Sequence, residues 1–122
     1  IGYVNQSFIK GNVVAAALEN KSGEFLKPSV ESGAIALNSI QLDQYLAGTN
    51  PNPTKEGAYP IATLTWVLAY ETGNGEKTSS IEDVLNYMLS DGSQDKAPSL
   101  GFIPLKGDIL KASRAAVNKI SE

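Results

Sequence analysis

An apolar stretch from Ala58 to Tyr70, with the sequence AYPIATLTWVLAY, has no charged residue until Glu71. A strand with one face in water would alternate apolar and polar residues, but from Ile61 onward only two threonines interrupt the apolar run. The pattern therefore predicts a β-strand that is covered on both faces, as in the central strands of α/β proteins. Pro60 fits the start of such a strand, where the ladder can spare a backbone donor.

The N-terminal segment predicts two small elements. Residues 1–4 are apolar and predict a buried strand, and residues 5–10 predict one or two helical turns that end at Gly11. Because the chain starts with Ile1 rather than Met and opens directly on an apolar strand pattern, we expect it to be a processed or truncated product.

A hairpin and a helix are predicted next. Two short apolar segments flank a polar turn that contains Asn20 and Gly23, which is typical of a β-hairpin with a longer loop, and Pro28 ends it. Ser29 fits the N-cap of a following helix, although Gly33 should weaken that helix by up to about 1 kcal/mol relative to alanine. The apolar positions of this helix are Val30, Ala34 and Leu37.

The second half of the chain predicts mainly helices separated by loops. Residues 46–57 and 71–77 are rich in glycine, asparagine or proline and predict loops. Ser79 and Glu82 have the spacing of a capping box that opens a helix, and Asp91-Gly92 is expected to end it. The apolar face of that helix is Ile81, Val84, Leu85, Met88 and Leu89.

The last 30 residues add one extended segment and one helix. Residues 94–100 predict a further turn or two of helix, and residues 101–105 predict an extended apolar segment. Asp108 is the predicted cap of a final helix. The apolar positions of this helix are Ile109, Ala112, Ala116, Val117 and Ile120.

Composition bounds the class of protein. The 122 residues are 42% hydrophobic and 19% charged, which indicates one globular domain. The net charge of −3 and the lack of a basic stripe argue against nucleic-acid binding. The chain has no cysteine and no histidine, so it cannot form a disulfide, a thiolate or imidazole metal site, or a Ser-His-Asp triad. No run is long enough to span a membrane, and no signal-peptide pattern opens the sequence.

Few residues are candidates for binding chemistry. Arg114 is the only arginine and so a possible anion clamp, but its place beside Lys111 and off the apolar stripe favours a solvated side chain. Thr63 and Thr65 share one face of the predicted central strand, where threonine usually reflects β-propensity. The tyrosines at the ends of that strand, Tyr59 and Tyr70, are expected to pack at an edge rather than bind a ligand.

Two other patterns also favour structural roles. Gly73-Asn74-Gly75 lacks the spacing and the lysine of a phosphate-binding loop, so a tight turn is expected. The carboxylates Glu19, Glu24 and Glu31 are scattered and show no pairing for acid–base catalysis. We therefore predict no catalytic residue, no metal site, no cofactor and no enzymatic activity.

Four segments occur in an order and at a spacing that resemble a known family. They are IGYV at residues 1–4, LENKSGEFLKPS at 18–29, YPIATLTWVLAY at 59–70 and LGFIPLKGDIL at 100–110. Together they closely resemble the C-terminal part of PstS-like phosphate-binding proteins, the extracytoplasmic receptors of phosphate ABC importers. The resemblance covers nearly the whole chain.

The resemblance implies an α/β fold of the two-lobed, type II periplasmic-binding-protein kind, whose lobes close over phosphate by a hinge motion. It implies that residues 1–57 end the second lobe, that 58–70 form the hinge and crossover strand, and that 71–122 complete the first lobe. The implied partners are inorganic phosphate, the missing N-terminal part of the receptor and an ABC permease. The implied location is periplasmic or extracytoplasmic, with any membrane anchor in the missing part.

The chain departs from the family at the ligand set. Family members hold phosphate with an Arg-x-x-x-Ser-Gly-Thr segment, among other groups, whereas Arg114 is followed by Ala115, Ala116 and Val117. The principal phosphate ligands are therefore expected upstream of Ile1, and no ligand-binding residue can be named in this chain.

Two alternatives stay open, namely a receptor for another oxyanion such as sulfate or molybdate, and a self-contained interaction domain.

If sheet neighbours are missing, residues 1–4 and 61–70 should expose apolar surface.

Overall fold

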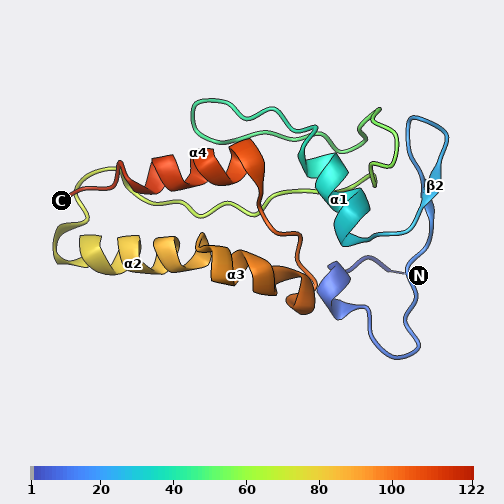
Figure 1. Cartoon of the computed structure of the whole chain (residues 1–122), viewed down its shortest axis with the longest axis horizontal. Helices are drawn as coiled ribbons and strands as arrows, with labels where there is room; N and C mark the ends of the chain where they lie inside the picture. The colour runs from blue at the N-terminus through green and yellow to red at the C-terminus, as the bar shows by residue number, and fades with distance from the viewer. Residues whose placement is uncertain (1) are drawn as a thin grey trace. The chain divides into compact units, whose positions relative to one another are not determined.

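The computed structural model describes residues 2–122, and its elements are mostly helical (Figure 1). Contacts divide the chain into two compact units, one formed by residues up to Leu64 with Ala97–Pro104, the other by Thr65–Lys96 with Leu105–Glu122. The elements in chain order are η1 (Gln6–Phe8), β1 (Leu18–Glu19), β2 (Phe25–Leu26), α1 (Val30–Leu37), η2 (Gly75–Lys77), α2 (Thr78–Met88), α3 (Asp91–Lys96), η3 (Ala97–Leu100) and α4 (Gly107–Val117).

Helix α1 forms the centre of the first unit, and its predicted cap is confirmed. The Ser29 hydroxyl accepts a hydrogen bond from the Ser32 amide at 3.1 Å, and the Ser29 amide donates to the Ser32 hydroxyl at 3.1 Å. This reciprocal pair satisfies two backbone donors at the start of the helix. The buried apolar side chains around the helix are Ala36, Leu37, Ile40, Pro53 and Ala58.

Gly33 in α1 has a packing role that offsets its low helix propensity. A Cβ at this position would collide with the Ile103 side chain. Ile103 lies in the predicted extended segment after η3, which the structure confirms as irregular chain. The glycine therefore allows this segment to approach the helix closely.

The predicted hairpin is confirmed, although its strands are short. β1 pairs antiparallel with β2, with Leu18 opposite Leu26 and Glu19 opposite Phe25. The turn is closed by a 3.0 Å hydrogen bond from the Gly23 amide to the Asn20 carbonyl, and Gly23 has a φ of 82°. Such a positive φ is readily adopted by glycine, as the turn residues predicted.

The predicted central strand is not formed. Residues 61–70 are irregular chain, and the sheet among the described residues contains only β1 and β2 (Figure 1). Ile61 even has a positive φ of 65°, which is incompatible with a strand. The apolar pattern predicted a segment covered on two faces, but a strand also needs neighbours for its backbone, and neither β1 nor β2 pairs with this segment.

The predicted N-terminal strand is absent as well. Residues 2–4 are irregular and exposed, while Ile1 lies outside the described residues. The predicted helical turn that follows is confirmed as η1, and Gly11 adopts a φ of 60° just beyond it.

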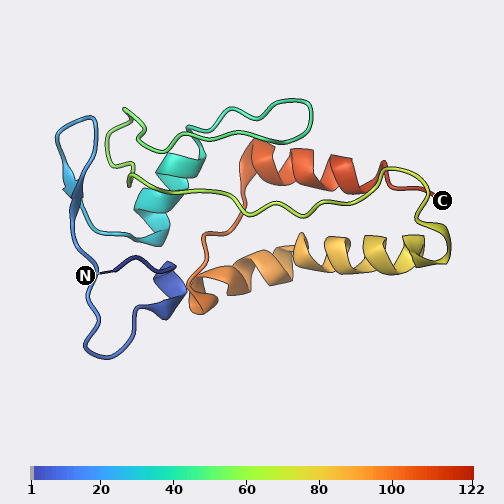
Figure 2. The ribbon, with the colours of Figure 1, turned by 180° about the vertical axis from the view of Figure 1, so that it is seen from behind.

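The second unit is built from α2, α3 and α4, and α4 packs against α2 (Figures 1 and 2). The predicted caps of these helices are wrong. α2 begins at Thr78 with Lys77 as N-cap, because the 3₁₀ turn η2 leads directly into it and places Ser79 inside its first turn. α4 begins at Gly107 with Lys106 as N-cap, so Asp108 lies in the first turn, where its charge still favours the helix dipole.

The boundary between α2 and α3 also differs from the prediction. α2 ends at Met88, and Asp91-Gly92 opens α3 instead of terminating the preceding helix. The predicted apolar face of α2 is only partly covered, since Val84 and Met88 are exposed. The turns predicted for residues 94–100 are confirmed as the end of α3 and η3.

Gly101 provides a test of the packing in the first unit. Its φ is 81°, and a Cβ there would lie 2.6 Å from the Ser7 Cα, so Gly101→Ala should destabilise the chain by about 1–3 kcal/mol. The matched control is Gly92→Ala in α3, where no atom lies within 4 Å and alanine should be neutral or stabilising. Urea unfolding of both variants measures the difference, and equal stabilities would contradict the close approach.

Candidate functional site

A buried amide links the hairpin to the loop before the apolar stretch. Asn20 is only 4% exposed, and its Nδ2 donates to the Ala58 carbonyl at 3.1 Å and to Glu24 Oε2 at 3.1 Å. Its Oδ1 accepts from the Ser22 amide at 3.0 Å, the Ser22 hydroxyl at 2.7 Å and the Glu24 amide at 3.0 Å. Because a buried polar group must be hydrogen-bonded to be tolerated, this geometry fixes the turn.

Glu24 completes the cluster that we call the polar clip, formed by Asn20, Ser22 and Glu24. The Glu24 carboxylate accepts from the Gly57 amide at 2.7 Å and from the Ser22 hydroxyl at 2.8 Å. These hydrogen bonds, with the Gly57 amide the largest contribution, lower the pKa of Glu24. In the sequence Glu24 is one of several scattered carboxylates, and only Asn20 and Gly23 indicated the turn that holds it.

The Arg114 side chain is partly exposed to solvent, as expected, but its guanidinium group also makes contacts that the sequence did not predict. It reaches from α4 to the end of α2, where Nε and Nη2 donate to the Leu89 carbonyl at 3.0 and 2.6 Å. Nη2 also pairs with Asp91 at 2.7 Å, with the two side chains 43% and 87% exposed. The side chain thus caps the free C-terminal carbonyl of one helix and contacts the first residue of the next. This arrangement ties three helices of the second unit together and does not resemble an anion clamp.

The threonines and tyrosines near the apolar stretch form no site. Thr63 and Thr65 are exposed on irregular chain, and the Thr63 hydroxyl donates to the adjacent Leu64 carbonyl at 3.3 Å. Tyr59 is half-buried, and burial raises its pKa. Tyr70 is exposed.

The glycine-rich segment is a turn, as predicted. Gly73 and Gly75 have φ values of 86° and 55°, and the side-chain Nδ2 of Asn74 donates to the Tyr70 carbonyl at 2.9 Å and to the Ser121 carbonyl at 3.3 Å. Asn74 therefore holds the end of the chain against this turn.

The remaining carboxylates show no catalytic arrangement. Glu31 lies in the first turn of α1, where its own amide and then the Ser29 side chain lower its pKa. Glu19 is exposed on β1. In the described part of the chain, histidine, cysteine, aspartate and glutamate form no cluster suited to a metal ion.

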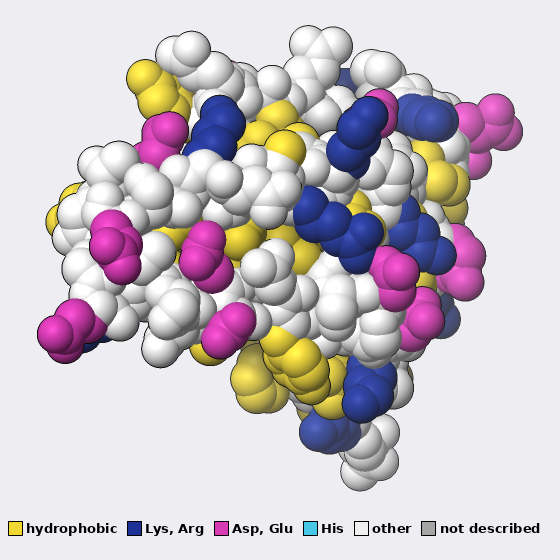
Figure 3. All heavy atoms as spheres, turned by 60° about the vertical axis from the view of Figure 1, so that its left-hand side comes forward, with side chains coloured by type: hydrophobic (Ala, Val, Ile, Leu, Met, Phe, Trp, Pro, Cys, Tyr) yellow, Lys and Arg dark blue, Asp and Glu magenta, His cyan; other side chains and the backbone are white. Residues whose placement is uncertain are grey.

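Apolar surface is exposed along the segment 61–70, which we call the apolar connector. Leu68 is 96% exposed, and on the N-terminal segment Tyr3 is 99% exposed. Figure 3 shows hydrophobic side chains reaching the surface between intermixed basic and acidic ones on one face. The exposure predicted for a chain that lacks sheet neighbours is thus confirmed for the described residues. The exposed large side chains of the connector are Ile61, Trp66, Val67, Leu68 and Tyr70.

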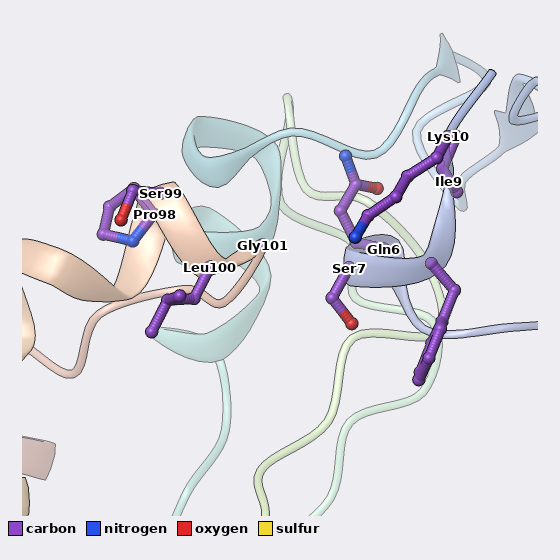
Figure 4. A pocket seen from close by; sticks show the side chains of 9 residues that line it. Gln6, Ser7, Ile9, Lys10, Pro98, Ser99, Leu100 and Gly101 are labelled. Carbon is purple, nitrogen blue, oxygen red and sulfur yellow. The ribbon is translucent and has the colours of Figure 1, made fainter.

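A hollow of about 480 Å³ in the first unit lies between the chain around η1 and the end of η3 with Gly101 (Figure 4). The Lys10 side chain reaches back toward Gln6 and Ser7 in this view. Gln6 is already engaged through a 3.4 Å hydrogen bond to the Pro28 carbonyl, and Lys10 is exposed. The hollow lacks the buried, convergent polar groups of a binding site.

Among residues 2–122, no helix has the length and apolar character that crossing a bilayer requires.

The Glu24 carboxylate gives the polar clip a defined pH dependence. Its folded pKa lies below the unfolded value, so its contribution to stability is present above the usual glutamate pKa and is lost as the pH falls through the lowered folded value. Glu24→Gln should therefore be less stable than the parent chain at pH 7, with a difference that shrinks below about pH 4. Denaturation at several pH values measures this, with the exposed Glu19→Gln on β1 as charge-matched control. A difference independent of pH would contradict it.

The Arg114 contacts give a second prediction. Arg114→Ala should lower the free energy of unfolding by about 1 kcal/mol, because two hydrogen bonds to the Leu89 carbonyl and the ion pair with Asp91 are lost at a half-exposed site. Lys111→Ala on the exposed side of the same helix is the control and should change little. Thermal unfolding of both variants measures the difference. If Arg114→Ala lowers the free energy of unfolding no more than Lys111→Ala does, the contact to Leu89 is not stabilising.

Sequence comparisons find curated relatives whose names describe phosphate-binding proteins. It is 31% identical to phosphate-binding protein PstS of Methanocaldococcus jannaschii, an alignment that covers 100% of this chain and 35% of that protein. It is 29% identical to phosphate-binding protein PstS of Haemophilus influenzae, covering 94% of the chain and 35% of the relative. The protein of the same name from Pasteurella multocida is 27% identical, with 94% and 34% covered. No family model matches the chain.

The chain therefore spans about a third of the length of the curated relatives it matches. This share fits the expected C-terminal portion of such a protein, and the relatives' names describe binding proteins rather than enzymes. The resemblance carried by the four sequence segments is confirmed, and this chain is related over nearly its whole length to part of the PstS phosphate-binding proteins.

Proposed function

We propose that this chain is the C-terminal part of an extracytoplasmic receptor that binds inorganic phosphate and delivers it to an ABC-type importer. The observation that carries the proposal is the similarity of the whole chain to relatives named phosphate-binding protein PstS. A receptor of this kind needs no catalytic residue, which agrees with the inventory of this sequence.

Within that receptor, the chain supplies scaffold and hinge rather than the principal phosphate ligands. We assign residues 1–57 to the end of the second lobe, 58–70 to the hinge and crossover strand, and 71–122 to the helices that complete the first lobe of a two-lobed, type II fold. The exposed apolar connector supports this, because its side chains suit a strand that is covered once the rest of the receptor is present.

No residue of this chain is assigned to phosphate. Arg114, the sole arginine, donates from Nε and Nη2 to the Leu89 carbonyl and from Nη2 to Asp91, so these two nitrogens are engaged within the protein. The ligand set is proposed to lie in the part of the receptor that precedes Ile1. The permease and the rest of the receptor are the proposed protein partners.

Calorimetric titration of the intact protein that contains these residues tests the proposal. Phosphate should bind, and sulfate should bind about tenfold to a hundredfold more weakly, because a site built for a protonated oxyanion leaves a buried acceptor unpaired with sulfate. The 122 residues alone should bind neither anion. Tighter binding of sulfate or molybdate would identify a receptor for another oxyanion, and tight phosphate binding by the 122 residues alone would refute the scaffold role.

A further inference from the structure

The turn between the apolar connector and α2 contains a chemically reactive pair of residues. Asn74 is followed by Gly75, and it is the only asparagine in the sequence that precedes a glycine. Asn74 is partly exposed and Gly75 is exposed. Because glycine has no Cβ and is conformationally permissive, its backbone nitrogen can approach the preceding side chain more easily than that of a larger residue. The pair is therefore a candidate for spontaneous deamidation.

The Asn74 side chain also has a structural role in the second unit. Its Nδ2 donates to the Tyr70 carbonyl at 2.9 Å and to the Ser121 carbonyl at 3.3 Å, which lie 4 and 47 positions away in the sequence. One amide group thus joins the chain before α2 to the chain after α4. The Ser121 amide adds a 2.8 Å hydrogen bond to the Glu71 carbonyl. Ser121 is therefore held to the turn partly through the Asn74 amide.

We propose that Asn74 is a site of spontaneous deamidation, and that its conversion to a carboxylate releases Ser121 from the turn. In the first step the Gly75 backbone nitrogen attacks Asn74 Cγ. A bond forms between these two atoms, the Cγ–Nδ2 bond breaks, and Nδ2 leaves as ammonia with the proton of the Gly75 nitrogen. Water then adds to either carbonyl of the cyclic imide and gives aspartate or isoaspartate. The inference concerns this turn and does not depend on phosphate binding.

The folded turn should slow this reaction without preventing it. Closing the five-membered ring requires Asn74 Cβ and the Gly75 nitrogen to be nearly eclipsed about the Cα–C bond, which the Asn74 ψ of −15° does not provide. The rotation that is needed pulls Nδ2 away from its two carbonyl partners and disturbs the 3.2 Å hydrogen bond from the Lys77 amide to the Asn74 carbonyl. These contacts lie in a largely exposed turn, so a local opening is sufficient to break them.

Deamidation replaces a hydrogen-bond donor with a negative charge. An ionised carboxylate only accepts hydrogen bonds, so it cannot bond the Tyr70 and Ser121 carbonyls and repels both. The same charge lies just before the N-terminal end of α2, where the helix dipole favours it. The loss should therefore be confined to the contact with Ser121, while α2 is retained.

The first test follows ageing of the intact protein that contains these residues. Peptide mapping by mass spectrometry measures conversion at Asn74 in the folded protein and in guanidinium chloride, with Asn118, which precedes a lysine, as internal control. In denaturant Asn74 should be converted faster than Asn118. In the folded protein, conversion at Asn74 should be about tenfold slower than in denaturant, because two hydrogen bonds must break first. No excess over Asn118 in denaturant, equal rates in the two states, or no conversion in the folded protein would overturn the proposed site.

The second test measures the release of Ser121. Asn74→Asp introduces the product charge directly, and Asn86→Asp makes the same change at an exposed position of α2 as the matched control. Amide hydrogen exchange at Ser121, followed by NMR, should be about tenfold faster in Asn74→Asp, since a donor is lost and a repulsive charge is added. It should stay at the parent value in Asn86→Asp. Unchanged exchange at Ser121 in Asn74→Asp would overturn the release, and faster exchange throughout α2 would contradict a loss confined to this contact.

Discussion

A β-strand is stable only where its backbone groups are hydrogen-bonded and its apolar side chains are buried. This requirement explains the conformation of residues 61–70. Residues 61–70 have the side chains of a buried strand but remain irregular and exposed among the described residues. Fully burying one large apolar side chain is worth about 1.5–3 kcal/mol, so a segment with several such side chains strongly favours association with missing neighbours. The chain spans only about a third of the length of its curated relatives.

Where sheet pairing is unavailable, polar side chains hold the backbone in place. In the first unit the polar clip does this, because the buried Asn20 amide bonds the Ala58 carbonyl and organises the turn through Ser22 and Glu24. The same turn binds the Gly57 amide. These side chains connect the hairpin turn to the loop at residues 57–58, in a hairpin whose strands are only two residues long.

In the second unit a single arginine has a comparable role. Arg114 bonds the carbonyl left free at the end of α2 and pairs with Asp91 at the start of α3. Its charge is therefore used to join helices, and the local sequence around it gave no sign of this, because its partners lie 23 and 25 positions earlier. In both units, then, a charged side chain, Glu24 or Arg114, holds a backbone group far away in the sequence.

Local sequence determined the Ser29 cap, the turn at Asn20 and Gly23 and the presence of helices, because each depends on residues close together in the chain. It did not determine where α2, α3 and α4 begin. The family resemblance rests on the order of segments along the chain. Tertiary structure decided the rest. It showed why α1 tolerates Gly33, which makes room for Ile103, and it assigned Glu24 and Arg114 to distant backbone partners. It also decided against the strand at 61–70, because an apolar pattern states which faces a segment can bury, whereas pairing depends on whether another strand is present to accept its hydrogen bonds.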